Sequence, residues 1–340
     1  MLAGVLLYLA FRGANLSQVG DALRQANYRW IVPLGVVTLL SHLVRAWRWQ
    51  VLLEALPARS QETHSRRVPL KAAFSALMIG YMVNYALPRM GEVVRTADLA
   101  AHEKLSFSGV LGTVVVERIL DVLTLALGLL LTVVLLFDQS AVLQELFLTP
   151  LQNQISQISL TTVLLLVLGI IVLAALSYGL GFRTDDALLR RLWNQRLRPL
   201  WVPFKDGLAT VLRSPRRFIL VFSTVLIWFL YTLMAYIPLL MFDMTGPYDL
   251  SLLDGMIIML IGAIGIAIPT PGGFGSYHYI TQVALGSLYG VNMSLALTYA
   301  IFVHGGQLVL YVVVGFLCLI LRGSSLGTLR RQAQTTQKEV

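Results

Sequence analysis

The sequence predicts an all-α fold, a polytopic bundle of membrane helices that forms a single membrane domain over residues 1–340. Hydrophobic residues make up 57% of the chain and charged residues only 13%, whereas soluble domains average about 25% charged residues. Mean hydropathy is +0.74. A chain of this length could form two or three soluble domains, but this composition indicates one membrane bundle instead.

Apolar runs predict six spanning helices, because a helix needs roughly 20 apolar residues to cross a bilayer. Five runs are long, and a shorter one stands at the N-terminus; the six are residues 30–55, 108–137, 158–181, 217–242, 295–321 and 1–11. Two further runs, 71–88 and 252–268, end in segments rich in proline and glycine. The residues after each are too polar or too interrupted for an ordinary lipid-facing helix.

The distribution of Lys and Arg predicts that these two runs belong to re-entrant hairpins. Basic residues gather in the segments 56–71, 89–107, 182–217 and 322–340 and are absent from 138–157, 243–251 and 286–294. Basic loops face the cytoplasm. This holds only if 71–107 returns to the cytoplasmic side and 252–290 returns to the outer side. Pro88 and Pro269 then lie near the tips, and both termini are cytoplasmic in a multi-pass protein of the plasma (inner) membrane. Such tips predict an internal cavity, since non-helical backbone at membrane depth needs protein or water around it.

An internal repeat supports this interpretation. An offset of 181 residues aligns Trp47 with Trp228, Pro88 with Pro269 and Gly91 with Gly272. The halves, residues 30–137 and 217–321, each contain a span, a hairpin and a span, joined by a cytoplasmic linker at 182–216. Because the two hairpins enter from opposite sides, the halves form an inverted-topology repeat, an architecture of secondary transporters.

Charged residues inside two predicted spans are candidates for function, since each costs roughly 2.5–3.5 kcal/mol on insertion scales. Arg45 and Arg48 share one helix face, and Glu117 and Asp121 share a face of another helix, with Arg118 between them. Their depths match, so we expect pairing between the two helices. The network either gates or couples the cavity, or fixes helix packing alone.

The first hairpin carries charges just after its tip. Glu92 and Arg95 stand three residues apart and are expected to pair locally, which would leave Arg89 to meet an anion. Helix N-termini and arginine both favour phosphate, so a phospholipid headgroup is a natural ligand. The alternative is that these residues anchor the hairpin at the interface.

The segment from Pro269 to His278 contains two prolines and three glycines, which break a helix and let backbone approach a ligand. His278 and His304 could exchange protons or serve as hydrogen-bonded packing residues.

Several function classes lack their sequence signals. The chain has no nucleotide-binding Walker A motif, no cysteine–histidine pattern with zinc spacing and no G-x-S-x-G motif. No cofactor or metal is therefore expected, and the chain is not expected to be an enzyme. The net charge of +9 lies in connecting segments, where it sets topology and attracts anionic lipid rather than nucleic acid.

Four motifs resemble the lysylphosphatidylglycerol synthase transmembrane-region family, which includes the flippase half of the multiple-peptide-resistance factor. The motifs are Arg45-Ala-Trp-Arg-Trp49, Asn84-x-x-x-Pro88-x-x-Gly91-Glu92-x-x-Arg95, Glu117-Arg118-x-x-Asp121 and Pro269-x-Pro-Gly-Gly-x-Gly275. The resemblance covers roughly residues 10–322 and implies a flippase-like domain for aminoacylated or related phospholipids. Unlike two-domain members, this sequence ends at Val340 without an aminoacyl-transferase domain, so lysyl-lipid synthesis is not expected and the lipid stays open.

The leading hypothesis is a translocase for phospholipid or lipid-linked headgroups. The residues expected to bind substrate are Asn84, Pro88, Arg89, Gly91, Glu92, Arg95, Pro269, Pro271, Gly272, Gly273, Gly275 and His278. The residues expected to gate are Arg45, Arg48, Glu117, Arg118, Asp121 and His304. Two alternatives stay open: a membrane-embedded transferase or accessory subunit of a lipid-modifying or glycosyl-transfer enzyme, and an interaction protein that transports nothing. A separately encoded lipid-modifying enzyme is compatible as a partner, and the oligomeric state is open.

Overall fold

The computed structural model describes residues 2–54, 68–87, 90–135, 216–268 and 270–322. The predicted span at 158–181 and the linker at 182–216, apart from Arg216, lie outside these residues, as do Pro88, Arg89 and Pro269. The chain divides into one unit of residues 1–132 and 211–340 and a second of 133–210. The first unit holds the helices below, except the last residues of α6.

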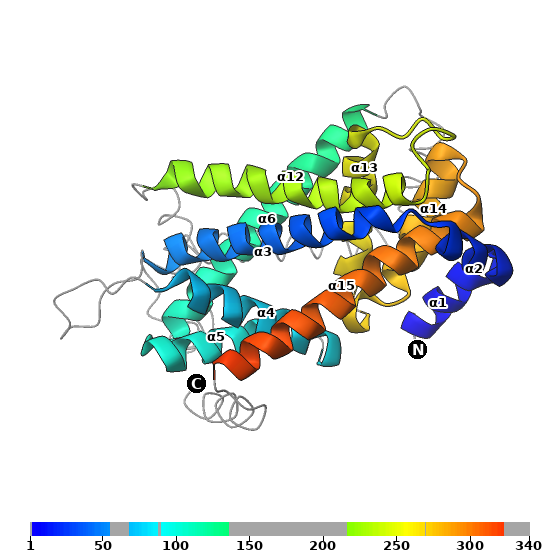
Figure 1. Cartoon of the computed structure of the whole chain (residues 1–340). Helices are drawn as coiled ribbons and strands as arrows, with labels where there is room; N and C mark the ends of the chain where they lie inside the picture. The colour runs from blue at the N-terminus through cyan, green and yellow to red at the C-terminus, as the bar shows by residue number, and fades with distance from the viewer. Residues whose placement is uncertain (1, 55–67, 88–89, 136–215, 269, 323–340) are drawn as a thin grey trace, which may run out of the picture. The chain divides into compact units, whose positions relative to one another are not determined.

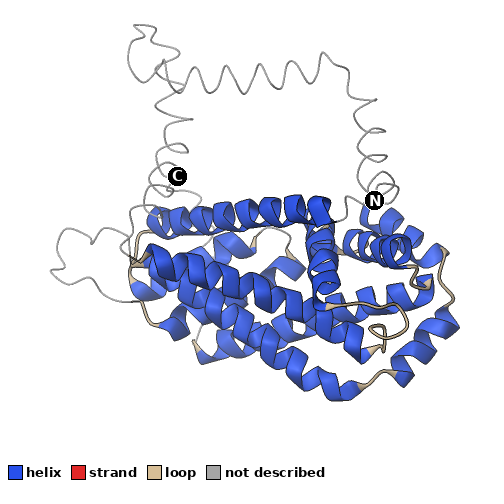
Figure 2. Cartoon of the chain, turned by 90° about the horizontal axis from the view of Figure 1, so that it is seen from above, coloured by secondary structure: helices blue, strands red, loops and turns tan. Residues whose placement is uncertain are grey.

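All regular structure in the described residues is helical (Figure 2), which confirms the predicted all-α class. The helices of the first half are α3 (Ile31–Leu53), α4 (Leu70–Ala86), α5 (Gly91–Glu103) and α6 (Phe107–Leu135). Those of the second half are α12 (Arg217–Met241), α13 (Leu252–Ala267), the short η4 (Pro271–Gly273), α14 (Ser276–Tyr289) and α15 (Met293–Leu321). Each half therefore contains a long helix, two shorter helices and a second long helix.

The N-terminal apolar run forms α1 (Leu2–Arg12), and two elements that the apolar runs did not predict follow it, α2 (Leu16–Gln25) and η1 (Tyr28–Trp30). In the described part of the chain, three helical segments are long and apolar enough to cross a membrane. They are Tyr28–Leu53, Arg217–Met241 and Met293–Leu321. The chain is thus a helical membrane protein.

Local sequence explains where the shorter helices begin and end. Leu87 and Ile268, which follow α4 and α13, have extended backbone; each precedes a proline in the sequence, and a proline disfavours helical geometry at the residue before it. The start of α13 carries a capping box between Ser251 and Asp254. The side chain of Asn292 caps α15 in a similar way, by accepting a hydrogen bond from a backbone N–H of the first turn.

Close glycine contacts hold the shorter helices together in pairs. In the first pair, a Cβ on Gly91 of α5 would collide with the Gly80 carbonyl oxygen of α4 and lie 2.5 Å from the Asn84 side chain. The Asn84 amide oxygen accepts a hydrogen bond from the Gly91 N–H at 2.7 Å. In the second pair, Gly262 and Gly265 of α13 let Tyr277 of α14 approach. Small residues at such contacts are the usual means of packing membrane helices closely.

The two halves meet through several sets of contacts. Helix α3 runs along α12, and α15 packs on α4 (Figure 1). Gly128 of α6 lies close to Leu260 of α13, so the closing helix of each half packs on the first hairpin helix of the other. Tyr85 at the end of α4 lies against Gly272 of η4, which brings the ends of the two hairpins together.

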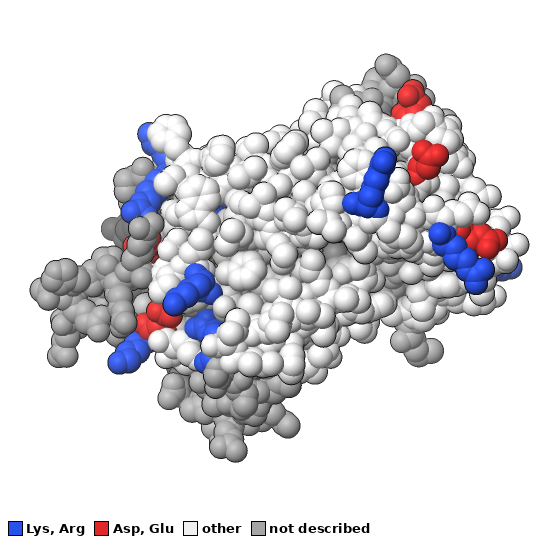
Figure 3. All heavy atoms as spheres, viewed as in Figure 1, with Lys and Arg blue, Asp and Glu red and all other residues white. Residues whose placement is uncertain are grey.

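Each half has its own buried core, and the outer surface is apolar. Trp49 and Leu77 anchor the first core, and Tyr299 and Ile258 anchor the second. Large apolar side chains stand exposed along α3, α6, α12 and α15. On the face in Figure 3, charged described residues lie mainly toward two ends with an uncharged surface between them. Soluble proteins rarely expose so many large apolar side chains along neighbouring helices. In a bilayer, lipid tails would cover these side chains.

We predict that Gly91→Ala destabilises the first hairpin, because the added Cβ would overlap the Gly80 carbonyl oxygen. Overpacking of this kind costs about 1–3 kcal/mol, so the melting temperature in detergent should fall by several degrees. Gly35→Ala in α3 is the matched control, since a Cβ there meets nothing within 4 Å. Equal melting temperatures for the two variants would contradict this packing.

Candidate functional site

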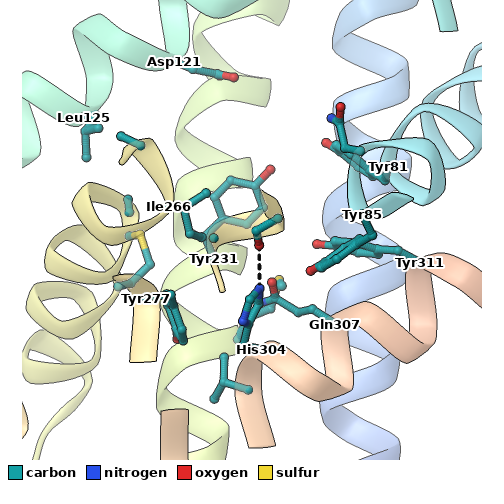
Figure 4. A pocket seen from close by; sticks show the side chains of 18 of the residues that line it. Tyr81, Tyr85, Asp121, Leu125, Tyr231, Ile266, Tyr277, His304, Gln307 and Tyr311 are labelled. Atoms are coloured by element: carbon teal, nitrogen blue, oxygen red, sulfur yellow. Dashed lines mark hydrogen bonds between the residues drawn. The ribbon is translucent and has the colours of Figure 1, made fainter. Parts of the chain in front are cut away.

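A cavity of about 810 Å³ lies where the two halves meet. Its walls come from the four helices of the first half and from α12, α13, η4, α14 and α15. Figure 4 shows side chains from both halves directed into it, among them Tyr81 and Asp121 from the first half and Tyr231 and His304 from the second. Its size falls within the range of small-molecule sites, about 300–1,000 Å³.

A buried ion network forms one end of this cavity, and Arg45 lies at its centre. The Arg45 Nε donates to Glu117 Oε1 at 2.7 Å, and Nη1 donates to the Tyr231 hydroxyl at 2.8 Å. Its Nη2 donates to the Asp121 carboxylate. Arg45 thereby ties α3 to α6 and to α12. The expected pairing of the charges on α3 and α6 is present.

Two further arginines complete the buried part of the network. Arg48 Nη2 donates to Asp121 Oδ1 at 2.6 Å, and Nη1 donates to the Thr224 hydroxyl at 3.1 Å. Arg95 Nη1 lies 3.2 Å from Glu117 Oε2, and its guanidinium carbon lies 4.8 Å from the Trp49 ring centroid. Arg48, Arg95 and Glu117 are almost fully buried, so this part of the network resembles a protein core more than a surface.

The outermost pair of the network joins Arg118 to Glu92, with 2.8 Å between Nη2 and Oε1. These side chains are 41% and 28% exposed and line the cavity. The expected local pair of Glu92 with Arg95 is therefore wrong. Helix α5 packs so that Arg95 turns inward to Glu117, while Glu92 faces the cavity and meets Arg118 from α6.

Aromatic rings line the cavity beyond the network. Tyr81 stacks on Tyr311 with 5.0 Å between ring centroids, and His42 meets both rings edge-on at 5.0 Å. The His42 Nε2 and the Tyr311 hydroxyl are 3.0 Å apart. Tyr85 continues the wall at 6.0 Å from Tyr311 and connects it to the second hairpin. Rings thus extend from the ion network to the opposite hairpin.

The second hairpin contributes a cluster of rings around His304. The His304 Nε2 donates to the Gly272 carbonyl oxygen at 2.9 Å (dashed line, Figure 4). Its ring centroid lies 4.8 Å from that of Phe274 and 5.0 Å from that of His278. His304 therefore lies at the second hairpin, apart from the ion network with which the sequence analysis grouped it. No described residue hydrogen-bonds the Nδ1 atoms of His278 and His304.

The glycines of the second hairpin have different surroundings. Gly272, Gly273 and Gly275 have φ angles of +57°, +79° and +82°, which favour glycine. Gly272 and Gly273 line the cavity together with Pro271. Gly275 instead packs against the backbone of α1, where a Cβ would lie 2.9 Å from the Leu7 nitrogen. The close approach inferred for Gly275 is thus to protein.

Several cavity residues were absent from the sequence-based set. They are Tyr81, Tyr85, Tyr231, Tyr277, Tyr311, Trp228 and Gln307. Tyr81 and Tyr85 stand four residues apart on α4 and so share one helix face, which is a usable signal. The others are single aromatic rings with a polar tip, together with the amide of Gln307, and only the packing of the two halves brings them together.

The family model described as lysylphosphatidylglycerol synthase TM region matches residues 1–315 of the chain. Neither a search of curated proteins nor a search of solved structures found a match.

We predict that Glu117→Gln strongly destabilises the protein. The substitution leaves Arg45, Arg48 and Arg95 buried beside one another with one carboxylate fewer. Breaking a buried ion pair costs about 3–5 kcal/mol, so thermal unfolding in detergent should shift markedly downward. The double variant Glu117→Gln/Arg95→Met should recover part of the loss, because it removes one unbalanced arginine.

Asp21→Asn on the exposed face of α2 is the control for this series and should change little. If Glu117→Gln melts at the wild-type temperature, the network does not stabilise the fold as inferred.

Proposed function

The chain belongs to the lysylphosphatidylglycerol synthase TM region family, and from this membership and the cavity we propose that it moves a lipid headgroup across the membrane. Family membership supports a lipid-related function in the membrane. The cavity is the observation that supports the more specific proposal, the movement of a lipid headgroup. It is lined by charged, hydroxyl and amide groups, yet the helices around it expose apolar side chains.

A cavity that carries polar groups among apolar ones, inside an apolar shell, suits a ligand with a polar head and apolar tails. In our proposal the headgroup enters the cavity while the acyl chains stay in the bilayer. The headgroup meets Arg118 and Glu92 at one end of the cavity and the rings near Tyr85 and His304 at the other. A lipid that exchanged leaflets by this route would keep its head out of hydrocarbon, where unsatisfied polar groups cost several kcal/mol.

We further propose that the two halves form an inverted repeat whose shorter helices are re-entrant hairpins. The repeated order of elements supports this, and so do the crossed contacts of α15 with α4 and of α6 with α13. In this arrangement the contact of Tyr85 with Gly272, which both line the cavity, would lie near the midplane. Both termini would face the cytoplasm, and the protein would act in the plasma membrane.

This proposal assigns the protein a transport role without chemical conversion of the lipid. A separately encoded enzyme would then supply or modify the lipid. The ion network would hold the cavity wall in place and adjust when the headgroup binds.

We predict that Ala263→Trp strongly slows lipid transfer, because Ala263 lines the cavity and an indole there would narrow the path of a headgroup. Purified protein in liposomes with fluorescent phospholipids should equilibrate label between leaflets, as dithionite quenching reports. The variant should lower the initial rate at least tenfold.

Val313→Trp is the matched control, because Val313 lies on the exposed surface of α15 and should transfer lipid at the wild-type rate. No transfer of any anionic, zwitterionic or lipid-linked sugar species by the wild type would sink the proposed function.

A further inference from the structure

We propose that the cavity selects a lipid whose headgroup carries one net negative charge on a phosphodiester and ends in an uncharged, hydroxylated group. This inference rests on the proposed function and deepens it by naming the substrate class. It follows from the balance of charge in the ion network and from the chemistry of the remaining cavity wall.

The network of described residues has one more arginine than carboxylates. Its cations are Arg45, Arg48, Arg95 and Arg118, and its anions are Glu92, Glu117 and Asp121. An unbalanced charge at membrane depth is costly, by roughly 2.5–3.5 kcal/mol on insertion scales. A ligand with one negative charge would neutralise the network, a zwitterion would leave its charge unchanged, and a cation would increase the imbalance. The charge balance therefore favours an anion.

Glu117 is fully buried and Asp121 is only 16% exposed, so a cationic headgroup has little access to either carboxylate. Glu117 contacts Arg45 and Arg95, with distances of 2.6 and 3.2 Å, and Asp121 accepts hydrogen bonds from Arg45 and Arg48. A lipid ammonium group would have to displace an arginine from either of them. Glu92 is the more accessible carboxylate, and its removal is therefore the decisive test for a cation.

Arg118 retains hydrogen-bonding capacity on the cavity side. It has one hydrogen bond in the described structure, from Nη2 to Glu92. Its Nη1 lies 3.8 Å from Asp121 Oδ2, beyond hydrogen-bond distance, and the side chain is 41% exposed. A guanidinium with open donors on a cavity wall suits the paired oxygens of a phosphodiester. The phosphate would join Arg118 and neutralise the excess charge.

The rest of the wall offers no charged side chain for a second ionic group. Apart from the network, the described lining consists of apolar residues, histidines, tyrosines, Trp228, Thr270 and the amides Asn84 and Gln307. Ring faces with hydroxyl and amide neighbours suit a polyol, which hydrogen-bonds at its edges and packs its C–H groups on rings. A lipid with a glycerol or inositol head fits this description, whereas the ammonium group of an ethanolamine, choline or lysyl head would have to compete with arginines for the two carboxylates of the wall, Glu92 and Asp121.

The test is a substrate panel in liposomes with opposed variants of one ion pair. Wild-type protein should transfer labelled phosphatidylglycerol and phosphatidylinositol at least tenfold faster than labelled phosphatidylethanolamine, phosphatidylcholine or lysylphosphatidylglycerol. Arg118→Gln should lower phosphatidylglycerol transfer at least tenfold, and Arg118→Lys should restore part of it. Glu92→Gln should raise the rate of this transfer, because it releases Arg118 from its ion pair and makes the network more positive. Arg24→Gln on the exposed face of α2 is the matched control.

The outcomes separate the inference from the function on which it rests. The anion assignment is wrong if the wild type transfers the zwitterionic or cationic lipids faster than phosphatidylglycerol, and if Glu92→Gln, but not Arg118→Gln, lowers that transfer. Lipid transfer itself would still be supported by this result. If Arg118→Gln and Glu92→Gln lower the transfer rate equally and both melt at lower temperatures, the pair is structural, and this result also overturns the anion assignment. Wild-type protein that transfers none of the lipids defeats the proposed function itself.

A soluble competitor distinguishes a lipid from a free anion. Glycerophosphoglycerol at millimolar concentration should leave phosphatidylglycerol transfer unchanged, since it lacks acyl chains to hold it at the cavity. Strong inhibition would show that the site binds the water-soluble phosphodiester, and would overturn the lipid as its ligand.

Discussion

The structure depends on placing three nearly fully buried arginines beside two carboxylates. Arg45, Arg48 and Arg95 are 4%, 0% and 2% exposed, and isolated charges at such positions would be prohibitively costly. Glu117 and Asp121 make the arrangement tolerable by each contacting more than one guanidinium. Because the participants come from α3, α5 and α6, the network fixes these helices relative to one another, and the hydrogen bond from Arg45 to Tyr231 extends the constraint to α12.

The cavity follows from this constraint and from the glycine contacts of the hairpins. The network forms a rigid wall of the cavity, while the hairpins depend on close backbone contacts at Gly80, Gly91 and Gly265. Polar groups therefore stay inside a bundle whose outer surface is apolar. The seam between the halves is the natural place for a ligand that is polar at one end, and the contact of Tyr85 with Gly272 is the natural barrier along it.

Sequence reasoning predicted the helical class and the shorter helices well, because their signals are local. Apolar runs and prolines placed the end of α4 at Ala86 and the end of α13 at Ala267 within two residues. The pairing of α3 with α6 was also predictable, since charges in an apolar helix need partners at the same depth. Which carboxylate pairs with which arginine was not predictable from the sequence. Glu92 and Arg95 suit a local pair by spacing, but the rotation of α5 sends them to Arg118 and Glu117, and that rotation is set by Gly91 against Gly80. The tyrosine wall and the position of His304 escaped prediction for a related reason, because they arise only where the halves meet.

The central claim is that a lipid headgroup occupies the cavity between the two halves. A structure determined in nanodiscs rich in phosphatidylglycerol tests it most directly. The account predicts headgroup density inside the cavity, with the phosphate within hydrogen-bond distance of Arg118 and the glycerol beside Tyr85. An empty cavity, with ordered lipid only along the outer faces of α3 and α12, would contradict it.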